Sequence, residues 1–214
     1  MGSMGAKQLH LISDGKRTLA EFAHIAALVE QYVDVFHIRE KTITARELCA
    51  GITEMLTLGI AADRIIVNDR ADAAAVMGVC GVHLAYHSLD AAQVKARFPE
   101  LRAGKSVHST IEAMQAEAAG VDYVMFGHVF PTASKANLPA RGLEALQQVV
   151  QQVRVPVLAI GGIYPTNVSE VLAAGAAGIA VMSGILDADD PVMQAARYKQ
   201  YIQAGRSEIH DKAL

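Results

Sequence analysis

Cysteine is scarce in this sequence, and neither a long apolar run nor a block of like charges occurs in it. Only Cys49 and Cys80 stand among the 214 residues, outside any CxxC pair, which favours a reducing compartment over a disulfide scaffold. No apolar run approaches the roughly 18 residues of a membrane span, and the N-terminus lacks the pattern of a signal peptide. We therefore predict a cytoplasmic protein that does not bind membranes.

The charge pattern argues against another class of partner. The formal net charge is −3 and no basic stripe is present, so nothing indicates nucleic acid or an anionic membrane. A small soluble molecule is the expected ligand. The sequence leaves open whether the chain forms a homo-oligomer through its outer helices.

Short apolar runs recur along the chain, and longer stretches with helical periodicity separate them. The runs cover residues 9–13, 35–40, 65–69, 81–85, 105–108, 123–129, 156–162 and 178–184. Strands that alternate with helices predict a parallel sheet covered on both faces. Repetition of this unit along the whole chain predicts a closed (β/α)8 TIM barrel, which must be a minimal one with short loops at this length.

We expect one domain over residues 6–214. A hydrophobic content of 52% supplies the core that such a domain needs. Residues 1–5, "MGSMG", are interpreted as an expression scar or a disordered N-terminus. The alternative fold, an open doubly wound sheet, is disfavoured because no GxGxxG follows the first predicted strand and no P-loop occurs.

Polar side chains gather at the carboxyl ends of the predicted strands, where such barrels carry their active sites. They are His37, Arg39 and Glu40 after the second run, Asn68 and Asp69 after the third, His108 after the fifth and His128 after the sixth. One histidine at a strand end is more often structural than catalytic, but three beside an arginine favour a catalytic site. No HxH or HExxH spacing occurs, so we predict no metal site. The remaining histidines considered, His10, His24, His83 and His87, are interpreted as structural or solvent-exposed.

Glycines and a serine follow the last two predicted strands. "AIGGI" places Gly161 and Gly162 there, and "VMSGI" places Ser183 and Gly184. Glycine lets a ligand approach the backbone closely, and bare N–H groups at loops and helix starts hold phosphate. Either group alone is typical of a tight turn, but both together predict a phosphate site. The expected ligand is therefore a small phosphorylated molecule.

Six segments carry a family resemblance over nearly the whole chain, in the order "HIREK", "VND", "SVHS", "GHVFPTASK", "AIGGI" and "VMSGI". The chain resembles the thiamine phosphate synthase superfamily of small barrels, and within it is most similar to the thiazole tautomerase branch. The synthases usually have Q-x-R-x-K, an aspartate that closes H-L-G-x-x-D, and G-P-x-F-x-T-x-T-K. Here His37 replaces the glutamine while Arg39 and Lys41 remain, Ser88 replaces the aspartate, and His128 replaces the proline.

These replacements favour the tautomerase branch. A diphosphate leaving group needs Mg²⁺, for which serine is a much poorer ligand than a carboxylate, and Asp69 alone makes an incomplete site. Proline performs no acid–base chemistry, whereas histidine does. We therefore predict an isomerase of thiamine biosynthesis that aromatises a carboxylated thiazole phosphate without a cofactor or a metal.

The resemblance implies roles for the residues at the predicted mouth. His128 moves a proton from the ring carbon that bears the carboxylate to the exocyclic alkene carbon. Arg39 pairs with the carboxylate, and His37 and His108 orient the ring or return the proton. Backbone N–H groups around Gly161, Gly162, Ser183 and Gly184 hold the phosphate. Further substrate contacts are Lys41, Asn68 and Lys135, the last on a loop at 131–142 that is long enough to act as a lid.

Two other functions stay open. One is a thiamine phosphate synthase that couples a pyrimidine diphosphate to a thiazole phosphate with Mg²⁺ in an altered site. The other is a barrel that binds a thiamine-related phosphate without catalysis and reports it to a protein partner. The polar strand ends argue against the second, because a sensor has no evident need for a proton shuttle.

Overall fold

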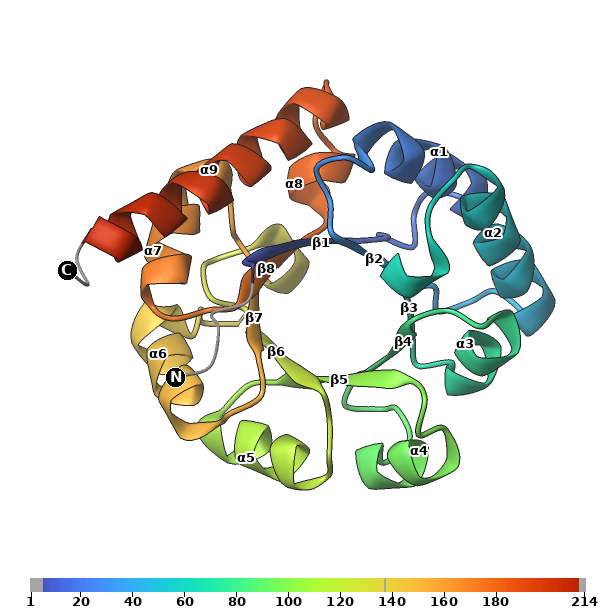
Figure 1. The fold of residues 1–214 in the computed structure, drawn as a ribbon, viewed down its shortest axis with the longest axis horizontal. Helices are drawn as coiled ribbons and strands as arrows, with labels where there is room; N and C mark the ends of the chain where they lie inside the picture. The colour runs from blue at the N-terminus through green and yellow to red at the C-terminus, as the bar shows by residue number, and fades with distance from the viewer. Residues whose placement is uncertain (1–5, 137, 212–214) are drawn as a thin grey trace.

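The structure, a computed structural model, describes residues 6–136 and 138–211, so the prediction made for residues 1–5 lies outside the described residues. The strands are β1 (Gln8–Ile12), β2 (Val35–Ile38), β3 (Ile65–Asn68), β4 (Gly81–Leu84), β5 (Arg102–Val107), β6 (Tyr123–Gly127), β7 (Val157–Ile160) and β8 (Gly178–Val181). Each strand pairs in parallel with the next, and β8 pairs with β1 to close the barrel (Figure 1). The predicted minimal (β/α)8 barrel is confirmed.

Helices surround the strands. They are α1 (Leu19–Val29), α2 (Ala45–Thr57), α3 (Ala71–Met77), α4 (Ala91–Arg97), α5 (Thr110–Ala118), α6 (Gly142–Gln152), α7 (Val168–Ala173), α8 (Ser183–Leu186) and α9 (Pro191–Asp211), with 3-10 turns η1 (Ala62–Arg64), η2 (Ala133–Lys135) and η3 (Pro165–Asn167). Figure 1 shows α9 outside α7 and α8, with which it makes contact. None of the described helices is long and apolar enough to cross a membrane.

Side-chain caps define where the first two helices begin. At α1, the N–H of Glu21 donates to the Thr18 hydroxyl, and the N–H of Thr18 donates to the Glu21 carboxylate. Thr44 and Glu47 make the same reciprocal pair at α2. Each capping box satisfies two backbone groups that a helix start would otherwise leave without partners.

The strand side chains alternate between the outer helices and the interior of the barrel. In β2, Phe36 and Ile38 belong to the large core between strands and helices, whereas Val35 belongs to a smaller apolar cluster inside the barrel. That interior cluster consists of Ile12, Val35, Ile66, Tyr123, Met125, Leu158 and Ala180. Three buried histidine rings, His10, His37 and His83, lie beside Tyr123. The barrel interior is therefore partly polar.

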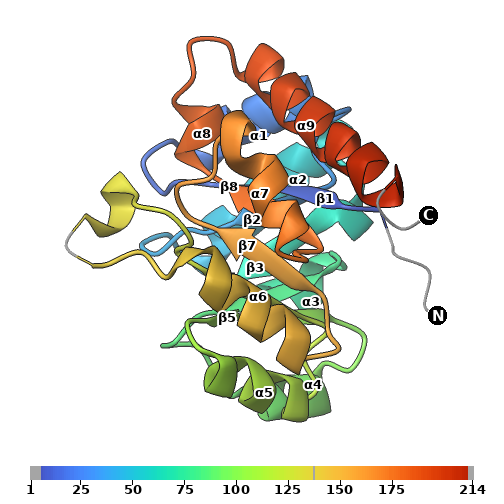
Figure 2. The ribbon, with the colours of Figure 1, turned by 90° about the vertical axis from the view of Figure 1, so that its left-hand side faces the viewer.

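The carboxyl ends of the strands define the mouth of the barrel. The loop between β6 and α6, of which residues 128–136 and 138–141 are described, projects beyond the strand ends at the left of Figure 2. In (β/α)8 barrels the residues that act on ligands come from this end.

Candidate active site at the barrel mouth

Ser13 joins the loops that follow β1 and β2. Its hydroxyl donates to Glu40 Oε1 at 2.7 Å and accepts from the N–H of Arg39 at 2.8 Å. Burial raises the pKa of the Glu40 carboxyl, although the bond from Ser13 opposes that shift. The predicted site residues Arg39 and Lys41 therefore lie at the mouth, on a loop that is anchored to β1, and the Lys41 side chain is exposed.

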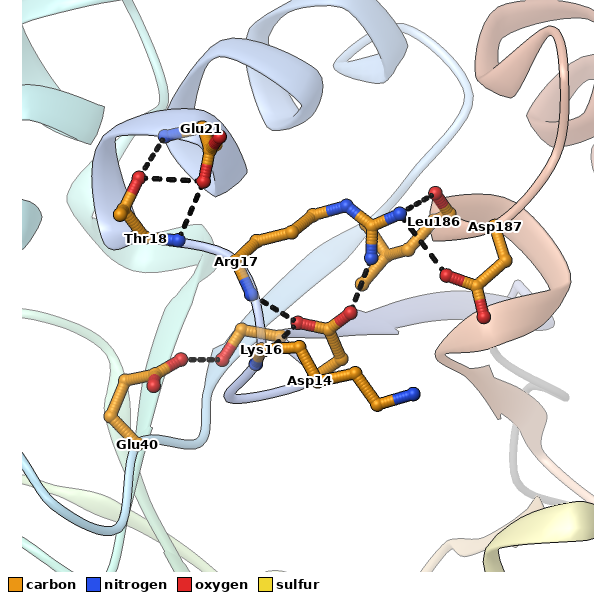
Figure 3. Close-up of polar contacts among 9 residues, drawn as sticks. Asp14, Lys16, Arg17, Thr18, Glu21, Glu40, Leu186 and Asp187 are labelled. Atoms are coloured by element: carbon orange, nitrogen blue, oxygen red, sulfur yellow. Dashed lines mark hydrogen bonds and ion pairs between the residues drawn. The ribbon is translucent and has the colours of Figure 1, made fainter.

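The loop after β1 is also bound to the end of α8. Arg17 pairs with Asp14, and its guanidinium donates to the carbonyl of Leu186 at 2.6 Å and to Asp187 Oδ1 at 3.1 Å (Figure 3). The carbonyl groups at the end of a helix lack partners inside the helix, so a cationic donor stabilises them. These contacts hold the loop after β1 against the end of α8.

Asn68 and Asp69 lie at the end of β3, as predicted. Asp69 has a left-handed backbone with φ of 68°, a region that Asp and Asn enter more readily than most residues. Its N–H donates to the carbonyl of His83 at 2.9 Å. The Oδ1 atom of Asn68 is buried and has no hydrogen-bond partner among the described residues. Asn68 therefore presents an unsatisfied polar atom beside the mouth.

His37 does not lie at the mouth, and its predicted position there is wrong. It is the third residue of β2 and is fully buried, and the alternation along the strand turns its side chain into the barrel. Its Nε2 atom lies 2.8 Å from Nδ1 of His10, while its Nδ1 atom has no partner among the described residues. The His10 ring, inside the barrel, therefore satisfies one of its two nitrogens.

The four histidines that were predicted to be structural or solvent-exposed have these two kinds of environment. His10 and His83 are buried and hydrogen-bonded, whereas His24 and His87 are exposed. Sequence reasoning did not find that the buried rings form a group with His37. The available signal was "LHL", "FHI" and "VHL" in the first, second and fourth strands, where each histidine lies between two outward-facing apolar residues.

Three basic side chains gather at the ends of β5 and β6. His108, Lys135 and Arg141 form this group, called the basic cluster below. Burial and then the positive charge of Lys135 lower the pKa of His108, while burial and then Arg141 lower the pKa of Lys135. His108 Nδ1 donates to Glu112 Oε2 at 3.2 Å, and Arg141 Nε donates to the carbonyl of Gly127 at 3.1 Å. An anion bound beside Lys135 and Arg141 would relieve the repulsion between these two cations.

The sequence predicted two members of the basic cluster and missed the third. His108 and Lys135 were candidates, whereas Arg141 was not. The available signal was a basic residue directly before Gly142, where α6 begins. The backbone also fixes Arg141 near β6, because its N–H donates to the carbonyl of His128 at 3.0 Å.

His128 follows β6 and lies beneath the loop that leads to α6. Its side chain is only 4% exposed, and its Nε2 donates to the carbonyl of Leu138 at 3.2 Å. Its Nδ1 atom is buried without a partner in the described part of the chain. A Cβ atom on Gly161 would overlap His128, so glycine at that position makes room for it. The ring is covered by the loop instead of standing open at the mouth.

Backbone amides at the ends of β7 and β8 form a second polar feature. Gly161 and Gly162 have φ of 98° and 65°, which glycine adopts without strain, and Ser183 and Gly184 begin α8. Within the described residues, no acceptor is present for the N–H groups of these four residues. Packing also requires glycine here, since a Cβ on Gly162 would lie 2.5 Å from the carbonyl of Pro131.

Fold and mouth together define a class of protein, a (β/α)8 barrel whose mouth suits a small anionic ligand. A family model described as thiamine monophosphate synthase matches residues 9–185 of the chain. The chain belongs to this family, whose members act on small phosphorylated molecules in thiamine biosynthesis.

Relatives resemble the chain over most of its length. The thiamine-phosphate synthase of Albidiferax ferrireducens is 37% identical over 209 residues, which cover 93% of this chain and 93% of the relative. That of Methanoculleus marisnigri is 35% identical over 195 residues, which cover 90% and 92%. The structure of thiamine phosphate pyrophosphorylase from Pyrococcus furiosus has a TM-score of 0.83 and 31% identity, covering 94% of this chain and 98% of that chain.

These relatives overturn the predicted activity. They are named as thiamine-phosphate synthases, which are transferases, so the prediction of an isomerase of the thiazole tautomerase branch is wrong. That prediction depended on replacements at His37, Ser88 and His128. Similarity at 37% and 35% identity, over 93% and 90% of the chain, outweighs these few positions.

Proposed function

We propose that this chain is a thiamine-phosphate synthase, which couples a pyrimidine diphosphate to a thiazole phosphate and releases the diphosphate. Besides the relatives, one structural observation supports the proposal. Two features suited to anions occupy neighbouring strand ends, the basic cluster at β5 and β6 and the unpaired amides at β7 and β8. The coupling needs two such sites, because both substrates are anionic. The rearranged substrate predicted from the sequence carries a carboxylate besides its phosphate, so the names of the relatives, and not the number of anion sites, favour coupling over rearrangement.

The two features differ in charge, which suggests how they divide the substrates. The basic cluster suits the diphosphate, since Lys135 and Arg141 supply charged donors to the group with the greater negative charge. The amides around Gly162 and Ser183 suit the phosphate of the thiazole, as uncharged N–H groups at a helix start commonly do. Holding each anionic group at a fixed place would bring the two heterocycles together above the barrel interior. Arg39 adds a third cation from the β2 side.

Magnesium fits this mouth with a small contribution from the protein. Asp69 supplies one carboxylate, whereas the Ser88 hydroxyl is used in a turn, where it accepts from the N–H of Ala85 at 2.8 Å. No three His, Cys, Asp or Glu side chains in the described ranges form a metal cage. Mg²⁺ at phosphate sites takes one or two carboxylates and completes its shell with phosphate oxygens and water. Asp69 would hold such an ion, whose chemistry is to neutralise charge on the diphosphate as it leaves.

An activity assay tests the proposal directly. The purified chain, mixed with the pyrimidine diphosphate, the thiazole phosphate and Mg²⁺, should form thiamine phosphate, and EDTA should abolish the product. The coupling moves no proton between carbon atoms, so His128→Asn should keep most of the activity. A complete mixture that yields no thiamine phosphate would refute the proposal.

Substitutions in the basic cluster test where the diphosphate binds. Lys135→Ala and Arg141→Ala should each raise KM for the pyrimidine diphosphate by roughly tenfold or more, because a charged hydrogen bond to phosphate is lost. Arg97→Ala removes an exposed cation from the end of α4 that lies away from the mouth and is the matched control. Equal effects of all three substitutions on KM would contradict this placement of the diphosphate.

A further inference from the structure

A row of polar side chains crosses the barrel interior from β1 to β3. Nε2 of His10 lies 3.2 Å from the amide oxygen of Gln8, and Nδ1 of His10 lies 2.8 Å from Nε2 of His37. Beyond them, Nδ1 of His37 and Oδ1 of Asn68 are both buried without a hydrogen-bond partner among the described residues. Gln8, His10, His37 and Asn68 are called the interior chain below. The interior chain connects Gln8, at the bottom of the barrel, to Asn68, at the mouth.

Both histidines of the interior chain are neutral. Burial, followed by the positive charge of Arg102, lowers the pKa of His10 to about 3. Burial, followed by the neighbouring rings, lowers the pKa of His37 well below its ordinary value, and the side chain of Asn68 acts against this shift as an acceptor close to the ring. The Asn68 side chain is thus close to the His37 ring, and both His37 Nδ1 and Asn68 Oδ1 are buried and still free to pair.

Because both rings are neutral, all N–H donors of the interior chain must point the same way along the row. A neutral imidazole has one N–H and one lone pair, so the bond between His10 and His37 sets both tautomers at once. Either every N–H points toward Asn68, or every N–H points toward Gln8. With the amides as they stand, each direction leaves two acceptors facing each other at one end. A half-turn of the terminal amide, which exchanges its oxygen and its NH₂ group without changing its shape, removes that conflict.

Electrostatics selects the direction. Gln8 and Arg102 are the first residues of β1 and β5, so the Arg102 cation lies at the same end of the barrel as Gln8. A cation at that end favours lone pairs that face it, and an anionic ligand at the mouth favours N–H groups that face the ligand. Both effects favour the same arrangement, in which Nδ1–H of His10 donates to His37 and Nδ1–H of His37 donates to Asn68.

We propose that His10 is a positioning residue for anion binding at the mouth. It holds His37 in the Nδ1–H tautomer, and His37 in turn holds Oδ1 of Asn68, so that the NH₂ group of Asn68 faces the ligand. Gln8 completes the arrangement by turning its NH₂ group toward Nε2 of His10. The anionic character of the ligand rests on the proposed function, whereas the direction of the interior chain can be measured without any ligand.

The tautomers of the wild-type protein provide the first test. ¹⁵N NMR of the imidazole rings at neutral pH distinguishes a protonated Nδ1 from a protonated Nε2. His10 and His37 should both show Nδ1–H. A protonated Nε2 on either ring would overturn the proposal, because the interior chain would then point toward Gln8. This measurement needs no substitution, so it does not depend on whether a variant folds.

A pair of matched variants provides the second test. His10→Phe keeps a ring but removes the bond to His37, so His37 should populate both tautomers and the affinity for inorganic pyrophosphate should fall roughly tenfold. His83→Phe is the control. His83 is equally buried but bonds to Tyr123 Oη at 3.1 Å and Ser106 Oγ at 2.8 Å, outside the interior chain. Its replacement should change neither the His37 tautomer nor the affinity.

The outcomes separate this proposal from the proposed function. Equal weakening of pyrophosphate binding in the two variants would overturn the role of His10, because it would reflect a general loss of interior packing. A wild-type chain that binds no pyrophosphate would refute the diphosphate site instead. In that case the NMR tautomers still decide whether His10 sets the direction of the interior chain.

Discussion

Acid should destabilise this barrel steeply, because its interior histidines must stay neutral in the folded state. Burial, followed by nearby cations, lowers the pKa of both His10 and His83 from 6.5 to about 3. Below pH 6.5 the unfolded chain binds protons that the folded chain does not, so the free energy of unfolding falls with pH until the folded pKa is reached. From about pH 7 to about pH 5, each of these histidines should remove about 2 kcal/mol. His37 acts in the same direction.

Together, His10 and His83 remove about 4 kcal/mol, a large part of a typical total stability of about 5–15 kcal/mol. Urea unfolding followed by circular dichroism at both pH values measures this loss. His83→Phe should reduce the difference between the two pH values by about 2 kcal/mol, whereas His24→Ala, which removes an exposed ring, should leave it unchanged. If wild type and His83→Phe lost the same free energy on acidification, buried neutral histidines would not be the cause.

Further substitutions test other parts of the site. A Cβ on Gly184 would overlap the Tyr198 hydroxyl, so Gly184→Ala should destabilise by about 1–3 kcal/mol in urea unfolding, and less in a Tyr198→Phe background, where the overlap is absent. Arg17→Met should remove about 1 kcal/mol through the lost bond to the Leu186 carbonyl, and this loss should persist in high salt, unlike that of an exposed ion pair. Asp69→Gly should leave the melting temperature unchanged or raise it, because glycine relieves the left-handed backbone, while Mg²⁺-dependent coupling is lost. A clear fall in the melting temperature of that variant would contradict the strain argument.

Much of the fold could be predicted because its signals are local. Apolar runs and helical periodicity located the strands and helices, and their alternation indicated a parallel barrel. The wrong predictions of the fold concern the ends of strands, because hydrogen-bond partners from other segments decide where a strand begins and ends. The predicted run 35–40 ends as a strand at Ile38, because the following loop is held by Ser13. In contrast, β5 begins at Arg102, earlier than the predicted run, because Arg102 pairs with Gly81 of the neighbouring strand.

The site could be predicted only in part, because its contacts join distant segments. The sequence identified His108 and Lys135, but Arg141 became relevant only when folding brought it beside them. His37 was predicted at the carboxyl end of its strand, yet its ring lies inside the barrel, and the atom that satisfies it belongs to His10, 27 residues away.

The prediction of an isomerase activity was wrong for a similar reason, because residue types were interpreted without their partners. Ser88 was taken to exclude a diphosphate because serine is a weak ligand for Mg²⁺, as though the protein had to supply the whole coordination shell. At phosphate sites the substrate supplies much of that shell, so the loss of one carboxylate leaves the chemistry open. Likewise, a histidine after β6 suggested a proton shuttle, but its position beneath the loop, bonded to Leu138, gives it a structural partner. A residue type therefore limits the chemistry at a position, whereas its partners decide which chemistry is used.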